Sequence, residues 1–283
     1  MVSQPDRPRG RGRKRSPSPV AARALDAGLP LHRPEHVAAP EIEAALRALS
    51  PDVGVVVSFG QFLPKRIREL PRLGFAINAH ASLLPRHRGA APIARAILAG
   101  EHETGISVMR VDREMDAGPV ALVRRTPIGE DEDAGSLEAR LAQLAAEAIA
   151  EALELLAAGT LTWTSQDASL ATLAPKLERE EARLDFREPA ETLVRRIRAF
   201  APRPGAFTEL AGEPLRILAA RAQAGGGATP GTLRLDTDGK ALRIATGRGW
   251  LVPLVLQRAG SRALPAEEFM RGARLSDGIH IGA

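Results

Sequence analysis

Four short runs of apolar residues mark the first half of the chain. The run Val53–Phe59 is rich in β-branched residues, and Gly60 follows it directly. The runs Phe75–Ala79, Gly105–Val111 and Val120–Arg124 have similar length and character. Runs this short that end at a turn residue are typical of strands buried inside a sheet. We therefore predict four strands in this half of the chain.

Segments with helical periodicity lie between and after these strands. Ala91–Ala99 reads as a helix, and Ser136–Ala158 gives the strongest helical signal, because apolar residues recur there at three-to-four spacing up to the stop at Gly159. Strands that alternate with helices favour an α/β domain with a mainly parallel open sheet covered on both faces. We assign residues 1–159 to this domain.

The pattern of apolar and polar residues changes near residue 160. Residues 160–177 are polar and irregular and are interpreted as a linker, and a short helix is predicted over Pro189–Phe200. Five short strand-like segments separated by glycine-rich turns follow: Ala206–Leu210, Leu215–Ala219, Gly231–Leu235, Ala241–Ala245 and Trp250–Leu256. Several short strands with little helix predict a small β-barrel over residues 178–283.

Composition narrows the class of protein. The 283 residues are 44% hydrophobic and contain no cysteine, which excludes disulfides, zinc–cysteine sites and thiol nucleophiles. No apolar run approaches the ~18 residues that span a bilayer, and no cleavable leader is visible. We expect a cytoplasmic protein that does not enter a membrane.

Positive charge gathers at the two ends of the chain. Residues 1–50 carry a net +4, residues 51–177 a net −3, and residues 178–283 a net +4. Such a distribution suits a polyanionic partner held from two sides. A compositional preference for arginine explains the same pattern equally well, because only four of the basic residues are lysine.

Three polar residues at predicted strand ends form a candidate catalytic site. Asn78 and His80 are two residues apart on an extended segment, so both side chains point to the same side. An amide and an imidazole placed in this way can hold a developing oxyanion. Asp116 follows another strand in a tight turn, from which its charge can orient His80 and favour the protonated ring.

Structural roles remain open for the same residues. A histidine after a strand often serves only as a hydrogen-bonded structural residue, and an aspartate before a glycine is common in turns. The other five histidines, His32, His36, His87, His102 and His280, show no ligand-like spacing and are interpreted as surface or packing residues. No metal site and no glycine-rich phosphate or dinucleotide motif is predicted.

Two longer stretches resemble a known family. The stretch NAHASLLPRHRGAAPI, from Asn78 to Ile93, and AGEHETGISVMRVDREMDAGPV, from Ala99, are similar to the folate-dependent formyltransferases. The resemblance implies that Asn78, His80 and Asp116 are catalytic. It also implies that the donor 10-formyltetrahydrofolate lies against four consecutive residues: Ser82, Leu83, Leu84 and Pro85.

The resemblance extends to family members that act on initiator tRNA. Gln4–Val20 looks like the basic loop that approaches the acceptor end of the tRNA in those members, and it implies tRNA contacts by Arg7, Arg9, Arg11, Arg13 and Lys14. Composition alone would favour a solvated, disordered tail for the same stretch. Lys176–Phe186 and Arg196–Phe207 look like the start of the family's C-terminal tRNA-binding domain.

The implied reaction is formyl transfer from 10-formyltetrahydrofolate to the α-amino group of methionine on initiator tRNA, for translation initiation. A monomer that needs no metal is expected. Three alternatives stay open. The chain can act on a small amine such as glycinamide ribonucleotide or an amino sugar, hydrolyse the formyl-folate, or be a catalytically impaired RNA-binding protein.

One departure from the family pattern concerns the start of the chain. Family members carry a strand and a helix ahead of the basic loop, and this sequence shows neither. We expect the sheet to lack its first strand, to leave apolar side chains at that edge in contact with water, and to be marginally stable.

Overall fold

The computed structural model describes residues 1–9, 12–236, 242–273 and 275–282. The chain folds as two compact units, each built from more than one stretch of sequence. Unit 1 comprises Met1–His80, Ser107–Val123 and Ala148–Ser169, and unit 2 comprises Ala81–Ile106, Arg124–Glu147 and Leu170–Ala283.

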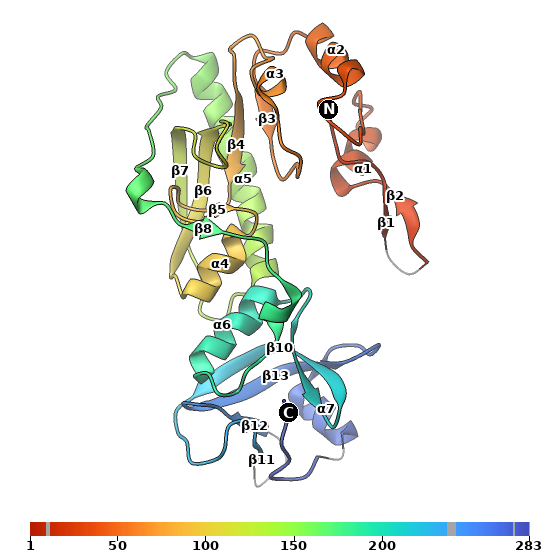
Figure 1. Cartoon of the computed structure of the whole chain (residues 1–283), viewed down its shortest axis with the longest axis vertical. Coiled ribbons are helices and arrows are strands. Elements are labelled where there is room, and N and C mark those ends of the chain that lie inside the picture. The colour runs from red at the N-terminus through yellow and green to blue at the C-terminus, as the bar shows by residue number, and fades with distance from the viewer. Residues whose placement is uncertain (10–11, 237–241, 274, 283) are drawn as a thin grey trace. The chain divides into compact units, whose positions relative to one another are not determined.

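Figure 1 labels the helices and most of the strands. The helices are α1 (Pro19–Asp26), α2 (Pro40–Ala48), α3 (Lys65–Arg68), α4 (Pro92–Ala99), α5 (Ala134–Ala157), α6 (Ala190–Phe200) and α7 (Ala266–Gly272). The strands of the first half are β1 (Arg7–Arg9), β2 (Lys14–Ser16), β3 (Gly54–Val56), β4 (Ala76–His80), β5 (Arg88–Gly89), β6 (Glu103–Arg110) and β7 (Val120–Pro127). The later strands are β8 (Leu173–Ala174), β9 (Ala206–Leu210), β10 (Glu213–Gln223), β11 (Leu233–Leu235), β12 (Leu242–Ala245), β13 (Trp250–Arg258) and β14 (Leu264–Pro265).

The four strands predicted in the first half form one sheet in the order β3-β4-β6-β7. β3 and β4 are parallel as expected, but β6 is antiparallel to β4, with His80 opposite Ser107. β6 therefore begins beside the carboxyl end of β4, and the chain does not have to cross to the other end of the sheet between the two strands. The sheet is mixed, which corrects the expectation of a mainly parallel one.

Helix boundaries follow local sequence signals. α1 begins after Ser18, whose hydroxyl accepts a hydrogen bond from the backbone of Ala21, and Pro19 occupies its first turn. α4 also starts with a proline and ends at Gly100, whose φ of 74° closes the helix in the left-handed conformation. α1 was not predicted from the sequence, because its buried residues are small alanines that give a weak apolar pattern.

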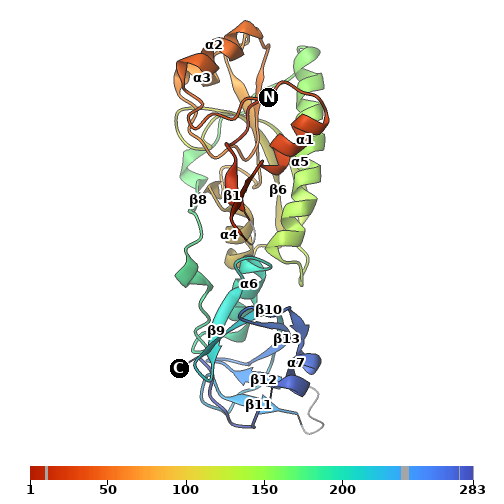
Figure 2. The ribbon, with the colours of Figure 1, turned by 90° about the vertical axis from the view of Figure 1, so that its right-hand side faces the viewer.

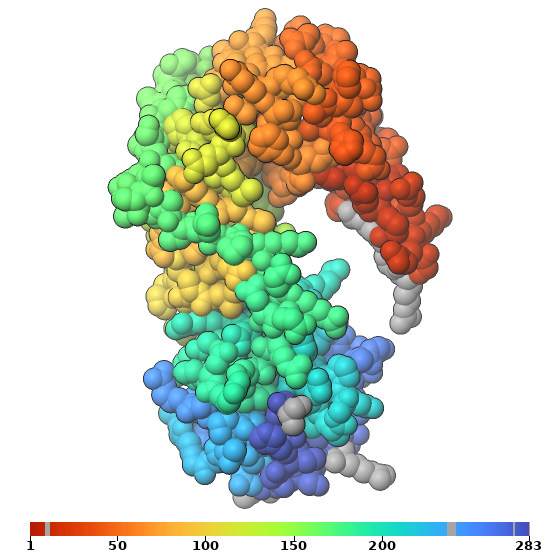
Figure 3. All heavy atoms as spheres, viewed as in Figure 1, coloured from red at the N-terminus to blue at the C-terminus, as the bar shows by residue number. Residues whose placement is uncertain are grey.

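The basic N-terminal stretch forms a hairpin instead of an irregular loop. β1 and β2 pair antiparallel, with Arg7 opposite Ser16 and Arg9 opposite Lys14. The proline and glycines of this stretch disfavour a helix, which leaves its short extended segments free to pair. In the space-filling view the hairpin residues form a projecting end of the N-terminal segment (Figure 3).

β3 lies at one end of the strand order, and β4 is its only neighbour among the described strands. Val55 on β3 is 45% exposed, and Val57 directly after it is 49% exposed. The backbone of Val2 pairs with His32 elsewhere in unit 1, outside the named strands. The expected exposure of apolar side chains at this edge is therefore present.

A strand added beside β3 should stabilise the protein. Complete burial of two half-exposed valines contributes about 2 kcal/mol, so a chain extended by a strand and a helix that cover β3 should melt about 4 °C higher. Thermal unfolding of the two chains under identical conditions measures the difference. An unchanged Tm would show that the edge of β3 is stable in contact with water.

The strands of the second half form a sheet in the order β11-β12-β13-β10-β9, with β14 paired to β13. α6 packs on β10, and α7 lies beside β13 (Figure 2). The strand pairing itself is open and does not close into the predicted barrel within the described residues. The C-terminal backbone links the two end strands instead, since Leu233 of β11 donates to the carbonyl of Ile279 and Gly282 donates to that of Glu209 on β9.

The segment interpreted as a linker is more ordered than its composition suggests. In unit 1, Thr164 and Val120 exchange two backbone hydrogen bonds of 2.8 and 2.9 Å. In unit 2, β8 pairs in parallel with β5. Backbone pairing of this kind leaves no pattern in side-chain hydropathy, so the sequence did not indicate it.

Candidate active site

Strand β4 places Asn78 and His80 on one side of the sheet in unit 1. Successive side chains of a strand point to opposite faces, so these two, which are two positions apart, point to the same face, as the sequence predicted. His80 is buried, with 6% of its side chain exposed, and Asn78 is half-buried. An amide at this position can direct its N–H groups toward a ligand on the same side of the strand as the imidazole.

Asp116 lies close to His80 although 36 positions separate them in sequence. One oxygen of the Asp116 carboxylate, Oδ2, lies 3.5 Å from Nδ1 of His80, and the carboxylate is 16% exposed. Asp116 itself has a φ of 52°, a left-handed conformation that is unusual for a residue other than glycine. At Gly118 a Cβ atom would lie 1.9 Å from the carbonyl oxygen of Arg110, so this turn requires a glycine there.

The arrangement suits chemistry at a carbonyl group. A carboxylate beside Nδ1 orients the imidazole of His80, which leaves Nε2 as the ring nitrogen directed away from Asp116. The amide of Asn78 lies on the same side of β4. Together the two side chains can donate hydrogen bonds to an oxyanion, and the imidazole can also carry a proton.

A residue that the sequence analysis did not identify contacts the Asp116 turn. The side-chain amide nitrogen of Gln166 donates to the carbonyl oxygens of Asp116, at 2.8 Å, and of Gly118, at 2.7 Å. Gln166 lies in the segment interpreted as a linker, where one glutamine among polar residues carries no distinctive signal. Only the folded chain shows this contact.

In unit 2 the residues after β4 form a compact loop. Ser82 is fully buried, and its hydroxyl donates to the carbonyl of Arg86 at 2.6 Å. Leu83, Leu84 and Pro85 are all half-buried and offer apolar surface. A Cβ atom at Gly105 would lie 2.7 Å from the side chain of Leu83, so this glycine gives the leucine its place. The hydroxyl of Ser82 thus serves the loop conformation and is not exposed.

His87 ties the end of this loop to other parts of unit 2. It is only 7% exposed, and its Nε2 lies 2.8 Å from the Glu101 carboxylate. Its backbone N–H donates to the hydroxyl of Thr172 at 2.9 Å. His87 also has a φ of 58°, a left-handed conformation that the pattern of apolar residues did not predict. Of the two interpretations, surface or packing residue, the structure supports the second. His87 is buried, and its contacts join the end of the loop to Glu101 and Thr172.

Several basic residues proposed to contact tRNA lie on the N-terminal hairpin. Arg13 and Lys14 are exposed, and Arg7 is 53% exposed while it pairs with Glu35 at 3.2 Å. Arg9 belongs to β1, and Arg11 lies outside the described residues. The hairpin thus presents cationic side chains to solvent, as a phosphate-binding element requires.

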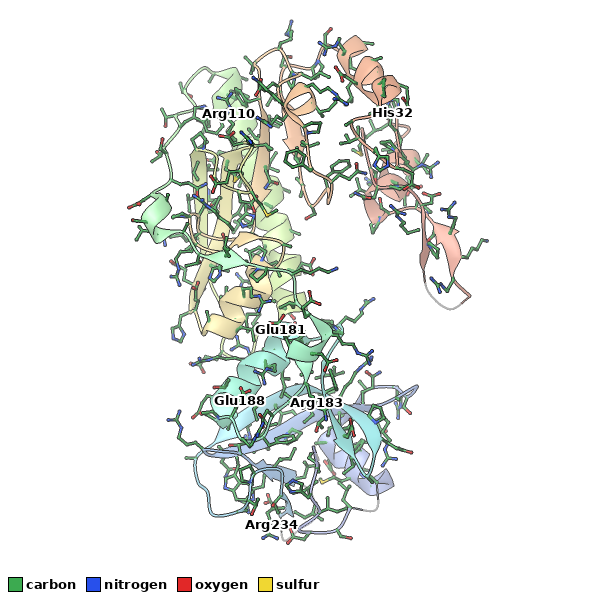
Figure 4. The ribbon with its side chains drawn as sticks, in the orientation of Figure 1. His32, Arg110, Glu181, Arg183, Glu188 and Arg234 are labelled. Carbon is green, nitrogen blue, oxygen red and sulfur yellow. The ribbon has the colours of Figure 1, made fainter. Side chains whose placement is uncertain are left out.

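A pocket of about 710 Å³ lies in the later part of unit 2, and none of the candidate residues lines it. Figure 4 labels three of its residues, Glu181, Arg183 and Glu188. Arg196 pairs with Glu188 at 2.9 Å, and the hydrogen-bonded Arg187 lowers the pKa of Asp185 to about 2. The four carboxylates of the pocket lining outnumber its three arginines, which disfavours an anionic ligand.

The described residues contain no group of three or more histidine, cysteine, aspartate and glutamate side chains placed to hold a metal ion. None of their helices has both the length and the apolar character needed to cross a membrane.

Two protein-family models match the chain. The model described as formyl transferase matches residues 1–153, and the one described as formyl transferase, C-terminal domain, matches residues 176–274. Together they account for most of the sequence. The boundary between them falls in the segment that contains Gln166 and Thr172.

Individual proteins agree with the family models. A protein of Chromohalobacter salexigens named methionyl-tRNA formyltransferase is 47% identical over 288 residues, covering 99% of this chain and 88% of its own length. A protein of the same name from Methylococcus capsulatus is 47% identical over 277 residues, with 98% and 89% covered. The crystal structure of HypX from Aquifex aeolicus in complex with tetrahydrofolic acid superposes with a TM-score of 0.62 at 21% identity, covering 88% of this chain and 43% of HypX.

Proposed function

The chain belongs to the formyl transferase family, and on that premise we propose that it formylates the α-amino group of methionine on initiator tRNA. The donor in this proposal is 10-formyltetrahydrofolate. The observation that carries the proposal is the His80–Asp116 pair beside Asn78 on β4, within a chain similar over nearly its whole length to methionyl-tRNA formyltransferases.

The three polar side chains have separate roles in the proposed reaction. The amine nitrogen attacks the formyl carbon, and Asn78 and protonated His80 donate hydrogen bonds to the oxygen as it becomes an oxyanion. The bond from the formyl carbon to the folate nitrogen then breaks. As that bond breaks, protonated His80 gives its proton to the folate nitrogen and then takes up the proton that the attacking nitrogen loses, while Asp116 holds the ring.

The folate is proposed to contact the loop after β4. Leu83, Leu84 and Pro85 present apolar side chains, which suit the flat ring system of a folate. Ser82 acts through the loop conformation, because its hydroxyl is committed to Arg86. HypX, whose crystal structure contains tetrahydrofolic acid, shares this fold at 21% identity.

The tRNA is proposed to bind at the hairpin of β1 and β2 and at the C-terminal region matched by the second family model. This assignment retains residues 1–159 as the catalytic domain and 178–283 as the tRNA-binding domain. It places the protein in the cytoplasm, where initiation occurs. One chain carries both regions, so a monomer suffices.

A comparison of acceptors tests the proposal. Labelled 10-formyltetrahydrofolate is offered with methionyl initiator tRNA, uncharged tRNA, free methionine, glycinamide ribonucleotide or an amino sugar. Transfer to the charged tRNA alone supports the proposal. Faster transfer to a small amine, or release of formate without an acceptor, would replace it with one of the alternative activities.

Salt concentration should affect the binding of tRNA much more strongly than the binding of the folate. Phosphate contacts release counterions, so with about three contacts the affinity for tRNA should fall on the order of ten-fold between about 50 and 200 mM salt. The KM for the folate should change much less, because its proposed contacts are largely apolar. Filter binding and initial rates measure the two effects, and a salt-independent tRNA affinity would contradict the proposed interface.

A further inference from the structure

Gln166 bridges the two ends of the short turn that carries Asp116. Its single amide nitrogen has two hydrogens, and it makes two hydrogen bonds, to the carbonyls of Asp116 and Gly118. Both acceptors are far from Gln166 in sequence and lie in part-buried surroundings. One side chain therefore fixes the backbone on both sides of Ala117.

The turn needs such a fixing contact. Asp116 adopts a left-handed conformation, with a φ of 52°, that disfavours a residue with a side chain. The residues before it, Asp112–Met115, are largely exposed, with Met115 at 69%. Relaxation of φ toward ordinary values would swing the Asp116 carboxylate away from His80, which now lies 3.5 Å from it.

Gln166 is itself held in place by the residues before it. The backbone of Thr164 exchanges two hydrogen bonds with Val120 at the start of β7. Trp163 packs edge-on against Phe75 with 5.5 Å between ring centroids, and the Arg110 guanidinium lies 5.0 Å from the centroid of the same phenyl ring. Figure 4 labels Arg110 on β6. These contacts anchor residues 163–166 on the sheet of unit 1, and Gln166 holds the Asp116 turn from this anchored segment.

We propose that Gln166 is a positioning residue for formyl transfer, which holds the Asp116 turn so that the carboxylate stays on Nδ1 of His80. The inference rests on the proposed function of Asp116 but adds a residue that contacts no substrate. It predicts that Gln166 acts on the chemical step through Asp116 alone.

A double-mutant cycle tests this inference. Gln166→Ala should lower kcat between about ten-fold and a hundred-fold, the scale of a misplaced catalytic group, and leave KM for both substrates within about two-fold. In an Asp116→Ala background, Gln166→Ala should lower kcat by less than about two-fold, because the group that it positions is gone. Gln143→Glu, at an exposed glutamine of α5, serves as the control and should have no effect.

Gln166→Glu is the shape-matched variant. It keeps the volume of the side chain, loses both N–H donors and should lower kcat at least as much as Gln166→Ala at neutral pH. As pH falls, the introduced carboxylate takes up a proton and regains one O–H donor, so the activity of Gln166→Glu relative to Gln166→Ala should rise. A purely packing role would give Gln166→Glu near-normal activity and a flat ratio, and would overturn the inference.

The possible outcomes separate a failure of the function proposed for Asp116 from a failure of the positioning role proposed for Gln166. Normal turnover in Asp116→Ala would remove the proposed function of Asp116 itself. A large loss in Asp116→Ala with normal turnover in Gln166→Ala would overturn only the positioning role. Equal losses from Gln166→Ala in both backgrounds would show a general structural effect and also overturn it. If Gln166→Ala melts early, the cycle with Gln166→Glu gives the same readings.

Discussion

Replacement of His80 by alanine is expected to lower kcat by about 10²-fold or more, the scale of losing an oxyanion donor together with a proton relay. Asn78→Ala and Asp116→Ala should produce losses of similar scale, since one removes the second donor and the other releases the imidazole. KM values should change little, because these groups act on charge that develops during the reaction. Single-turnover rates with formyl-folate and charged tRNA measure the effect.

The control for this series is chosen from the chain itself. His102→Ala removes an exposed histidine and should leave kcat unchanged. Asn78→Asp keeps the shape of the side chain but replaces the N–H donors by a carboxylate, so it should be as inactive as Asn78→Ala. Near-normal turnover in a folded His80→Ala protein would remove the site from β4.

Neutralising the N-terminal hairpin is expected to raise KM for tRNA roughly ten-fold while KM for the folate stays constant. The change is Arg7→Gln, Arg13→Gln and Lys14→Gln, and each lost phosphate contact should also reduce the salt slope of tRNA binding by about one unit. Substitution is preferable to deletion because neighbouring residues hold unit 1 together. Gln4 donates to the carbonyl of Phe59, and Asp6 pairs with Arg33.

A matched set of substitutions checks that position matters as well as charge. Arg47→Gln, Arg66→Gln and Arg72→Gln neutralise three exposed arginines of unit 1 outside the hairpin, the same number of charges, and should leave KM for tRNA within about two-fold. Equal weakening by both sets would mean that net charge alone attracts the tRNA. Loss of folate affinity in the hairpin variant would indicate a structural role for the hairpin.

Apolar patterns predicted the strands that pack on a core and missed elements that do not. β9 was predicted with its observed bounds, Ala206–Leu210, because its buried and half-buried residues alternate. β3 is shorter than the predicted Val53–Phe59, since it has only one strand neighbour among the described strands. The hairpin of β1 and β2 has neither alternation nor a core face, so nothing in its hydropathy indicated strands.

The candidate site shows the same division between local and distant contacts. The shared face of Asn78 and His80 follows from strand alternation and was predicted directly. The approach of Asp116 to His80 was expected from their positions after two strands and from the resemblance, and it is present at 3.5 Å. The contact of Gln166 with the Asp116 turn joins residues 50 positions apart through backbone carbonyls, which have no sequence signature. Folding alone brings them together.

The most direct test of the central claim identifies the product of one turnover. Methionyl initiator tRNA is incubated with the protein and 10-formyltetrahydrofolate, and the aminoacyl end is then released and analysed by mass spectrometry. The account predicts one formyl group on the α-amino nitrogen of methionine, formed by the unaltered chain and nearly absent with His80→Ala. Unmodified methionine after incubation with a correctly folded chain, or equal product from both proteins, would contradict it.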